Sequence, residues 1–293
     1  MPRRTRPWRW TAMVLVVTLT GIGATALAGP AHAVADSEPE TVTGLTVVSH
    51  NSGGYNSPGS KTVTASCPSG QKVFGPGGTI DLGLGEVVLD EIVPSTDLTS
   101  VTVQGLEHGN SSRNWDVTAY AICADPVDYM LLVHDDSPQN TSSPKNVTVE
   151  CPLGLRVYGL GAEIINGQGN VTLDDLDIDE SLTFVDVGAY GWHGTTVSNS
   201  WAVRAYAVCG TPTPTMLRKK TQQLTTSPNT VVHSPSCPSG TRLTGIGGEL
   251  SGAQGDAVFD DLTPELDDDR AYVQAQDIGA GGWTTSAYGV CAS

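Results

Sequence analysis

Pairs of acidic residues recur three times in the chain and are the first candidates for chemistry. Two neighbouring carboxylates could act as acid and base in the hydrolysis of a polysaccharide. Adjacent residues of a strand point to opposite faces, however, so such a pair does not readily flank one bond. We therefore favour a carboxylate that accepts backbone hydrogen bonds in a turn. Each pair precedes an aliphatic residue, and the triplets are Asp90-Glu91-Ile92, Asp174-Asp175-Leu176 and Asp260-Asp261-Leu262.

The second triplet continues into an acidic run that could bind calcium. Asp174, Asp175, Asp177 and Asp179 place hard oxygen ligands close together in the sequence. The run lacks the central glycine and terminal glutamate of the EF-hand loop, and a solvated acidic face is the alternative interpretation. Apart from calcium, the sequence predicts no cofactor.

A glycine-flanked aromatic segment is the best candidate for ligand binding. It reads Gly188-Ala189-Tyr190-Gly191-Trp192-His193-Gly194. Glycines on both sides of aromatic residues are typical of an exposed loop, where binding residues concentrate. We therefore predict that Tyr190, Trp192 and His193 contact a ligand. The counterpart earlier in the chain, Gly105-Leu106-Glu107-His108-Gly109, differs, so only the later segment is expected to bind.

These candidates lie in a sequence repeat that occurs three times. Each copy opens with Cys-Pro-x-Gly and closes about 55 residues later with Trp-x-x-x-Ala-Tyr-x-x-Cys. Glycines recur at the third, eighth, tenth and eighteenth positions after the first cysteine, and the acidic pair begins at the twenty-third. Regularity of this kind indicates three copies of one supersecondary unit. The copies run from Cys67 to Cys123, from Cys151 to Cys209 and from Cys237 to Cys291.

The repeats have the residue pattern of β-strands. Residues 62–66, 100–104 and 115–122 alternate with a period of two or are β-branched and aromatic. Matched glycines predict left-handed turns or places where another strand passes too close for a side chain. The sequence predicts an all-β fold of three tandem disulfide-stapled β repeats of about 84 residues. They form either small β-sandwiches or one pseudo-threefold, β-prism-like body.

The chain divides into five segments. Residues 1–33 are expected to be a removable signal peptide, because arginines precede an apolar stretch and Ala31-His32-Ala33 resembles a cleavage site. A linker is predicted at 34–41, and the β repeats at 42–126, 127–211 and 212–293. Export predicts a secreted, extracellular protein, and the mature sequence contains no apolar run long enough for a membrane span.

Six cysteines, two in each repeat, predict three disulfides. Six cysteines allow fifteen pairings. A scheme that joins neighbouring repeats leaves Cys67 and Cys291 to pair across a closed ring. We therefore predict pairing inside each repeat, as Cys67–Cys123, Cys151–Cys209 and Cys237–Cys291. Trp115, Trp201 and Trp283 share their strands with a cysteine and are expected to pack in the core against the disulfide.

Charge excludes one class of partner. Without the four arginines of residues 1–33, 11 basic residues face 31 acidic ones, a net charge of −20. Such a chain repels nucleic acid and anionic membranes. A glycan or a protein of the cell envelope is the predicted partner. The sequence does not determine the oligomeric state.

The repeat resembles that of exported bacterial proteins, mostly of unassigned function, that begin with Cys-Pro-x-Gly-x-x-Val-x-Gly and end with Trp-x-Val-x-Ala-Tyr-Ala-Val-Cys. Here the motif reads Cys67-Pro68-Ser69-Gly70 with Trp115 to Cys123. The resemblance implies export and β structure. Cys237-Pro238, Gly245 and Gly255-Asp256 show a remoter likeness to the vitelline membrane outer layer family, a lectin-like β-prism, although the period here is longer. That likeness implies contact with glycans or the envelope.

No motif of a known enzyme class is present, so the sequence favours a non-catalytic function. We expect a secreted binding module that contacts extracellular or cell-envelope glycans or a protein partner, because threefold repetition favours multivalent binding. A structural or protective coat component is the first alternative. A secreted polysaccharide hydrolase that uses the aspartate pairs is the second.

Overall fold

Strands form nearly all the regular structure of the described residues. The computed structural model describes residues 40–224, 229–279 and 282–293, which lie in the unit Pro39–Ser293. The predicted signal peptide 1–33 and most of the predicted linker 34–41 lie outside the described residues. Strands β1 to β18 and one short 3₁₀ helix, η1 (Trp192–Gly194), are the regular elements of the described part. None of the described segments is a helix with the length and apolar character of a membrane span. The all-β prediction is confirmed.

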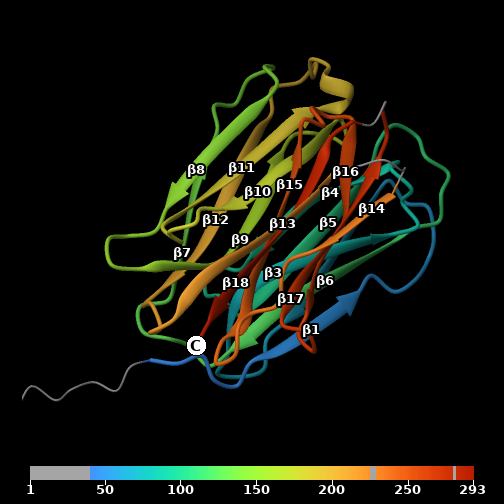
Figure 1. The fold of residues 1–293 in the computed structure, drawn as a ribbon. Coiled ribbons are helices and arrows are strands. Elements are labelled where there is room, and N and C mark those ends of the chain that lie inside the picture. The colour runs from blue at the N-terminus through green and yellow to red at the C-terminus, as the bar shows by residue number, and fades with distance from the viewer. Residues whose placement is uncertain (1–39, 225–228, 280–281) are drawn as a thin grey trace, which may run out of the picture. The chain divides into compact units, whose positions relative to one another are not determined.

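The strands form three six-stranded antiparallel sheets (Figure 1). The first sheet has the order β1 (Thr46–Asn51), β6 (Asp116–Ala124), β3 (Lys72–Asp81), β16 (Ala257–Glu265), β17 (Arg270–Asp277) and β14 (Asn229–His233). The second has β2 (Ser60–Ser66), β5 (Ser100–Glu107), β4 (Val87–Pro94), β9 (Arg156–Ile165), β12 (Ala202–Gly210) and β7 (Leu131–Asp136). The third has β13 (Met216–Leu224), β18 (Thr284–Ala292), β15 (Arg242–Ser251), β10 (Val171–Ile178), β11 (Phe184–Gly191) and β8 (Lys145–Glu150).

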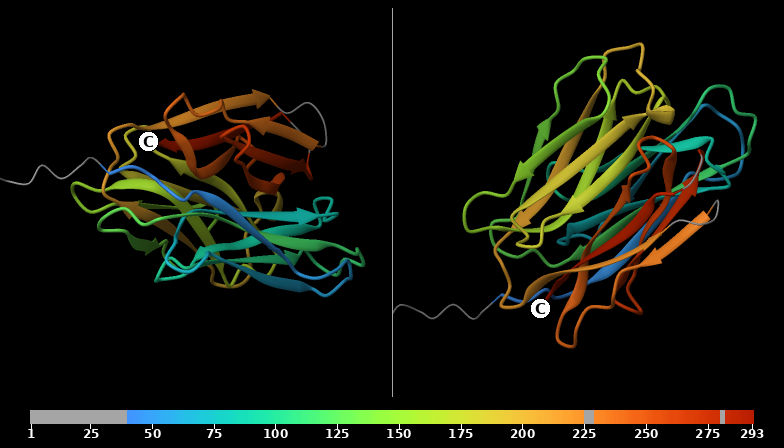
Figure 2. Two further views of the ribbon diagram at one scale, coloured as in Figure 1. Left: turned by 90° about the horizontal axis from the view of Figure 1, so that it is seen from below. Right: turned by 45° about the horizontal axis from the view of Figure 1, so that its top comes forward.

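Each sheet joins half of one repeat to half of another. Strands β1, β3 and β6 of the first repeat continue into β14, β16 and β17 of the third, and the other two sheets are divided in the same way. We call the strand pairs that join two repeats, β3–β16, β4–β9 and β10–β15, the seams. Of the two predicted architectures, the structure therefore has the single body, and the repeats are not separate sandwiches (Figure 2).

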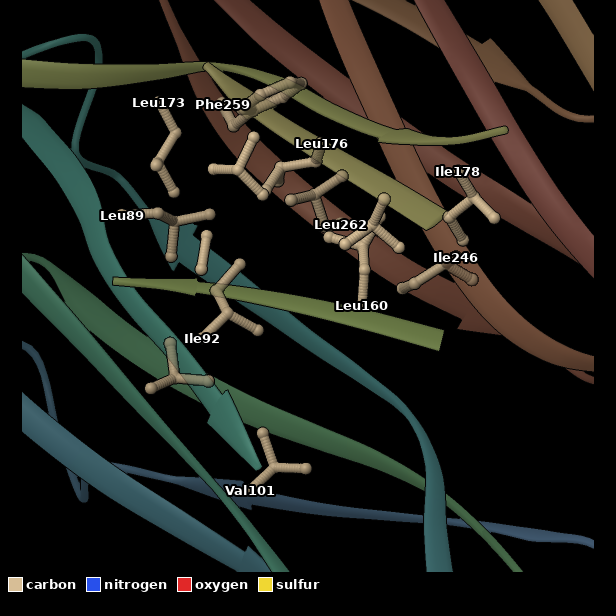
Figure 3. Packing of buried hydrophobic residues seen from close by; sticks show 14 of the residues in the cluster. Leu89, Ile92, Val101, Leu160, Leu173, Leu176, Ile178, Ile246, Phe259 and Leu262 are labelled. Atoms are coloured by element: carbon tan, nitrogen blue, oxygen red, sulfur yellow. The ribbon is translucent and has the colours of Figure 1, made fainter. Parts of the chain in front are cut away.

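A continuous apolar core fills the space between the sheets. Leu160 and Ile246 meet Ile92, Leu176 and Leu262, one from each seam, around a cavity of about 10 Å³ (Figure 3). The inward residues alternate with exposed ones, as in β2, because successive side chains of a strand point to opposite faces. This shared core explains why the three thin repeats fold together.

The three recurring tryptophans also belong to the core. Trp115, Trp201 and Trp283 are at most 2 % exposed, as predicted. Each directly precedes the strand that carries the closing cysteine near its other end, eight residues away, which is about 26 Å along an extended chain. The prediction that they pack against the disulfide is therefore wrong.

Recurring glycines form a ring where the repeats meet. A Cβ atom at Gly75 would lie 2.4 Å from the carbonyl oxygen of Thr244, and one at Gly159 would lie 2.3 Å from that of Phe74. One at Gly245 would lie 2.0 Å from the carbonyl oxygen of Tyr158, which closes the cycle of three repeats. The close approach predicted from the matched glycines is confirmed, and it occurs between repeats.

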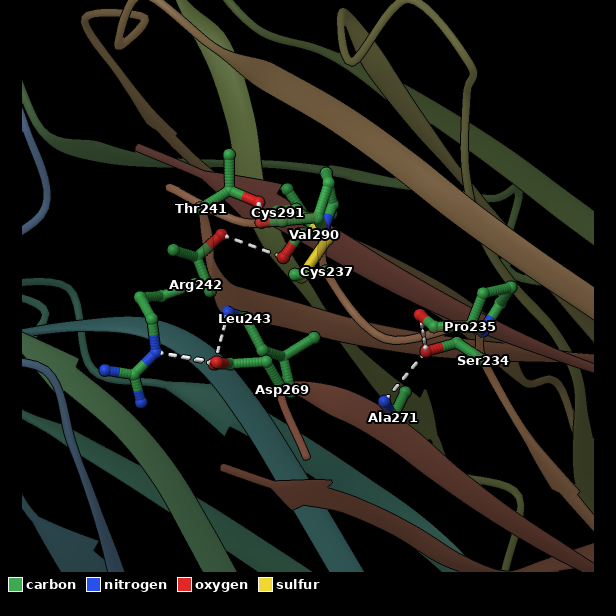
Figure 4. Close-up of a disulfide and its surroundings, with 12 residues drawn as sticks. Ser234, Pro235, Cys237, Thr241, Arg242, Leu243, Asp269, Ala271, Val290 and Cys291 are labelled. Carbon is green, nitrogen blue, oxygen red and sulfur yellow. Dashed lines mark hydrogen bonds and ion pairs between the residues drawn. A yellow bond between two sulfur atoms is a disulfide. The ribbon is translucent and has the colours of Figure 1, made fainter. Parts of the chain in front are cut away.

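The disulfides are Cys67–Cys123, Cys151–Cys209 and Cys237–Cys291, as predicted, and Figure 4 shows the last of them. In the first repeat, Cys67 follows β2 of the second sheet, and Cys123 lies in β6 of the first sheet. The bond therefore links the two sheets to which the repeat contributes. Disulfides of this kind are typical of proteins that fold in an oxidising compartment.

Candidate functional site

A surface pocket of about 330 Å³ lies at the ends of β5 and β11. β5 ends at Glu107, so His108 is the first residue beyond it, and β11 ends at Gly191, just before Trp192. The turn between β9 and β10 adds Asn170, whose carbonyl oxygen accepts a hydrogen bond from the Trp192 amide at 2.9 Å. The complete lining is His108, Asn170, Trp192, His193, Thr195, Thr196, Val197 and Ser198.

His108 of the first repeat stacks on Trp192 of the second. The two rings are parallel, with centroids 3.7 Å apart. Nδ1 of His108 is 2.9 Å from the carbonyl oxygen of Gly169. Because a carbonyl oxygen can only accept, the proton of a neutral His108 ring is on Nδ1. The stack and this hydrogen bond fix the ring in the pocket wall.

His193 connects the pocket to the third repeat. Its backbone is left-handed, with φ 51°, and its amide donates to the carbonyl oxygen of Gly255 at 2.9 Å. Nδ1 of the ring is 2.7 Å from Oδ1 of Asp256, and both side chains are partly exposed. The Asp256 carboxylate of the third repeat is thus in contact with the His193 ring of the second repeat.

The glycine at the eighteenth position of the repeat permits these contacts. A Cβ atom at Gly169 would lie 2.1 Å from the carbonyl oxygen of Glu107, and one at Gly255 would lie 2.3 Å from that of Gly191. Both glycines also have positive φ, 72° and 90°. The turns that border the pocket can therefore approach the neighbouring repeat only with glycine at these positions.

Two of the three residues predicted to bind a ligand lie at the pocket. Trp192 and His193 line the pocket, whereas Tyr190 does not. Tyr190 lies within β11 opposite Thr172, so the predicted loop begins two residues later than Tyr190. The glycine that suggested a loop has another role, because a Cβ at Gly188 would lie 2.7 Å from the Asp175 carboxylate.

Sequence reasoning missed His108 and Asp256, which come from other repeats. The signal was present, because His108 and Trp192 each follow the matched strands β5 and β11 directly. In the third repeat, Ile278 follows β17 at the equivalent place, without an aromatic ring, and packs near Gly85. The first and second repeats therefore both supply rings to this pocket. Binding by the second repeat stays a prediction.

The aspartates that open the acidic triplets are β-bulge residues at the seams. The strand register shifts at Asp90, Asp174 and Asp260, so each is an extra residue in its strand. Their assignment to turns is therefore wrong. On β4 the core residues Leu89 and Ile92 are separated by two residues rather than one. Asp90 and Glu91 consequently lie on the same outer face, contrary to the simple alternation assumed from the sequence.

Two of the three bulge aspartates, Asp90 and Asp174, are buried, and burial raises the pKa of both carboxyl groups. Asp90 and Asp174 are both 4 % exposed, and the Oδ1 atom of each has no hydrogen-bond partner among the described residues. Burial, with the nearby Asp175 and Glu249, raises the pKa of Asp174 to about 8. Burial, with Glu91 and Glu163, likewise raises the pKa of Asp90 to about 8. These carboxyl groups are largely protonated at pH 7.

Carboxylates of different repeats face each other across two of the seams. Glu91 lies opposite Glu163, and Asp175 lies opposite Glu249. The Tyr288 hydroxyl and Lys220 Nζ donate to Oε2 of Glu249 at 2.5 and 2.9 Å. Burial acts to raise the pKa of Glu249, but these hydrogen bonds outweigh it and lower the pKa. Counting matched positions would have found Glu163 and Glu249, which both lie at the twelfth position of their repeats.

The four aspartates proposed for calcium do not share a loop. Asp174, Asp175 and Asp177 lie in β10, and only Asp179 lies in the following turn. The Asp179 carboxylate already accepts hydrogen bonds from the amides of Ser181, Thr183 and Phe184. Within residues 40–224, 229–279 and 282–293, no group of three or more His, Cys, Asp or Glu side chains is arranged to hold a metal ion. Calcium binding by the four aspartates stays a prediction of the sequence alone.

Comparison of the chain with family models and with curated proteins finds no match. The fold and the contacts described above therefore carry the functional argument.

Proposed function

We propose that the protein is a secreted, non-catalytic module that binds a glycan in the pocket formed by His108, Trp192 and His193. The observation that carries the proposal is the composition of this pocket. An indole and two imidazoles stand beside an amide and several hydroxyl groups, in a volume of about 330 Å³. Sugars present apolar C–H faces and many hydroxyl groups, and both find partners in such a wall.

Rigid positioning of the rings supports the proposal. His108 is held by a carbonyl oxygen and by the stack on Trp192, and His193 is held by Asp256. A wall fixed before the ligand arrives loses less conformational entropy on binding. Export of the protein would place this pocket among extracellular or envelope glycans, and the three disulfides agree with that location.

Binding to an array of neutral oligosaccharides, followed by calorimetry on the strongest ligand, tests this function. Trp192→Ala should weaken binding about tenfold or more, because it removes the indole surface. Tyr55→Ala is the matched control, since Tyr55 is a 55 % exposed aromatic residue outside the pocket, and it should leave binding unchanged.

Fluorescence gives an independent readout of the same site. Trp192 is partly exposed, whereas the other tryptophans of residues 40–224, 229–279 and 282–293 are buried. A bound sugar should protect Trp192 from quenching by acrylamide. If no oligosaccharide binds, or if binding survives Trp192→Ala, the proposed function is wrong.

Hydrolysis of a polysaccharide at the third-sheet seam is a second candidate function. The observation in its favour is that burial raises the pKa of Asp174 to about 8, while hydrogen bonds lower that of the nearby Glu249. Two carboxyl groups with pKa values moved apart are what an acid and a base or nucleophile require. Release of reducing ends by the wild-type protein, but not by Asp174→Asn or Glu249→Gln, would support it. Full activity in both variants would exclude these residues.

A further inference from the structure

The two histidines of the pocket have the same hydrogen-bonding arrangement. Nδ1 of His108 faces the Gly169 carbonyl oxygen at 2.9 Å, and Nδ1 of His193 faces the Asp256 carboxylate at 2.7 Å. Both oxygens are acceptors only, so each neutral ring carries its proton on Nδ1. Nε2 of each ring has no hydrogen-bond partner within the described residues and remains for a ligand as an unprotonated acceptor.

An acceptor at Nε2 discriminates between the two kinds of oxygen that a sugar can offer. A hydroxyl group donates a hydrogen bond as readily as it accepts one, so it pairs with Nε2 whether or not that atom is protonated. A carboxylate can only accept, so it is repelled by an unprotonated Nε2 and gains a charge-assisted hydrogen bond once Nε2 is protonated. Histidine ordinarily takes up this proton between about pH 8 and pH 5.

We infer that the pocket selects neutral saccharides over carboxylate-bearing ones near pH 8 and admits the carboxylate-bearing ones as the pH falls to 5. This inference rests on the proposed function, because it names the ligand class of the same site and how pH controls it. Protonation leaves the wall intact, since both Nδ1 atoms still donate to the same oxygens and an imidazolium stacks well on an indole.

The other charged groups around the two rings are already paired with protein groups. Glu107, next to His108, turns away and accepts a hydrogen bond from Nε1 of Trp115 at 2.9 Å. Glu86, whose carbonyl oxygen accepts from the His108 amide, pairs its side chain with Arg113 at 2.8 Å. Asp256 faces His193 and, within the part of the chain that the structure describes, is the carboxylate that contacts a pocket ring. The ring atoms left to face a ligand are therefore the two Nε2 atoms.

The experiment compares matched sugars that differ in one group. Glucose- and galactose-based oligosaccharides are paired with the corresponding glucuronate and galacturonate oligosaccharides, and each binds the full-length mature protein in calorimetry at pH 8 and pH 5. We expect the neutral sugars to bind at both pH values within about threefold. The uronates should bind at least about tenfold more tightly at pH 5 than at pH 8, as one charge-assisted hydrogen bond allows.

Glutamine variants identify the groups responsible. In His108→Gln with His193→Gln, the side-chain amides carry N–H donors at every pH. Loss of the two rings should weaken the binding of every sugar, and the ratio between the uronate affinities at pH 5 and at pH 8 should shrink to less than about threefold. If the wild-type protein binds neutral sugars but its affinity for uronates does not change with pH, this inference is wrong and the proposed function still stands. Uronate binding that stays pH-dependent in the double variant would also overturn it. Absence of binding by every sugar would overturn both.

Discussion

Asp175 on β10 lies directly opposite Glu249 on β15, so two carboxyl groups from different repeats face each other across a seam. Like charges in directly opposed positions destabilise a sheet. Burial, followed by the charge of Glu249, raises the pKa of Asp175 to about 6. Asp175 therefore keeps its proton to a higher pH than an ordinary aspartate, and below about pH 6 this proton removes the repulsion across the seam.

The first prediction is that the protein becomes more stable on acidification from pH 8 to about pH 5. Burial, with neighbouring acids, raises the pKa of Asp90 and Asp174 to about 8 and that of Asp260 to about 7. An unfolded aspartate has a pKa of about 4. Between these values the folded state binds more protons than the unfolded state, so the free energy of unfolding falls as the pH rises. Each of these aspartates changes the free energy of unfolding by on the order of a few kcal/mol across this pH range.

Denaturant titrations at pH 5, 6, 7 and 8 measure this dependence. The midpoint should decrease steadily towards pH 8 and level off above the folded pKa values. A midpoint that increases over this range would show that the bulge aspartates are ionised in the folded protein.

The second prediction contrasts two aspartates of the same segment. Asp174→Asn removes a buried carboxyl group whose ionisation is unfavourable, so the variant should be more stable than the wild type at pH 8 by about 1 kcal/mol or more. Asp179→Asn should destabilise by about 1 kcal/mol, because Asp179 accepts three amide hydrogen bonds that hold its pKa low against the effect of burial. Denaturant unfolding at pH 8 should therefore give a higher free energy of unfolding than the wild type for Asp174→Asn and a lower one for Asp179→Asn. Equal effects of the two substitutions would contradict this account.

Much of the fold could be predicted because it depends on local rules that are repeated three times. The strands follow the period of two, and the matched glycines at Gly75, Gly159 and Gly245 indicated close approach. The exchange of strand triplets between repeats could not be predicted, because hydrogen bonds between strands look alike whichever repeat supplies them. The pairing of the cysteines was correct, although the argument against a closed ring was not: the β3–β16 seam closes it.

The candidate site was only half predictable for a related reason. Trp192 and His193 lie next to each other in the sequence, so one glycine-flanked segment indicated both. His108 and Asp256 reach the pocket from other repeats, and no local pattern marks a contact between residues so distant in sequence. The bulge at Asp174 likewise escaped prediction, because a strand with one extra residue has no distinct sequence pattern beyond a broken alternation.

The third prediction concerns the disulfides. Cys67→Ser with Cys123→Ser removes a link between the first and second sheets and should reduce the free energy of unfolding by about 2–5 kcal/mol. The corresponding pair Cys151→Ser with Cys209→Ser should have a similar effect, because its loop has nearly the same length, 58 against 56 residues. Denaturant titration of the purified variants checks this, and a loss below about 1 kcal/mol in both would show that the disulfides add little to the shared core.

The last prediction tests the ring of glycines between the repeats. Gly159→Ala would place a methyl group 2.3 Å from the carbonyl oxygen of Phe74, which is backbone and cannot move aside alone. Strands β9 and β3, which belong to different sheets, would have to move apart, so we expect a loss of about 2 kcal/mol or more in the free energy of unfolding. Gly59→Ala is the control, because a Cβ there meets no atom within 4 Å and its φ is not left-handed, and it should change stability by less than about 0.5 kcal/mol. If both variants unfold at the wild-type midpoint, the repeats do not meet through these glycines, and the closed arrangement of three sheets is wrong.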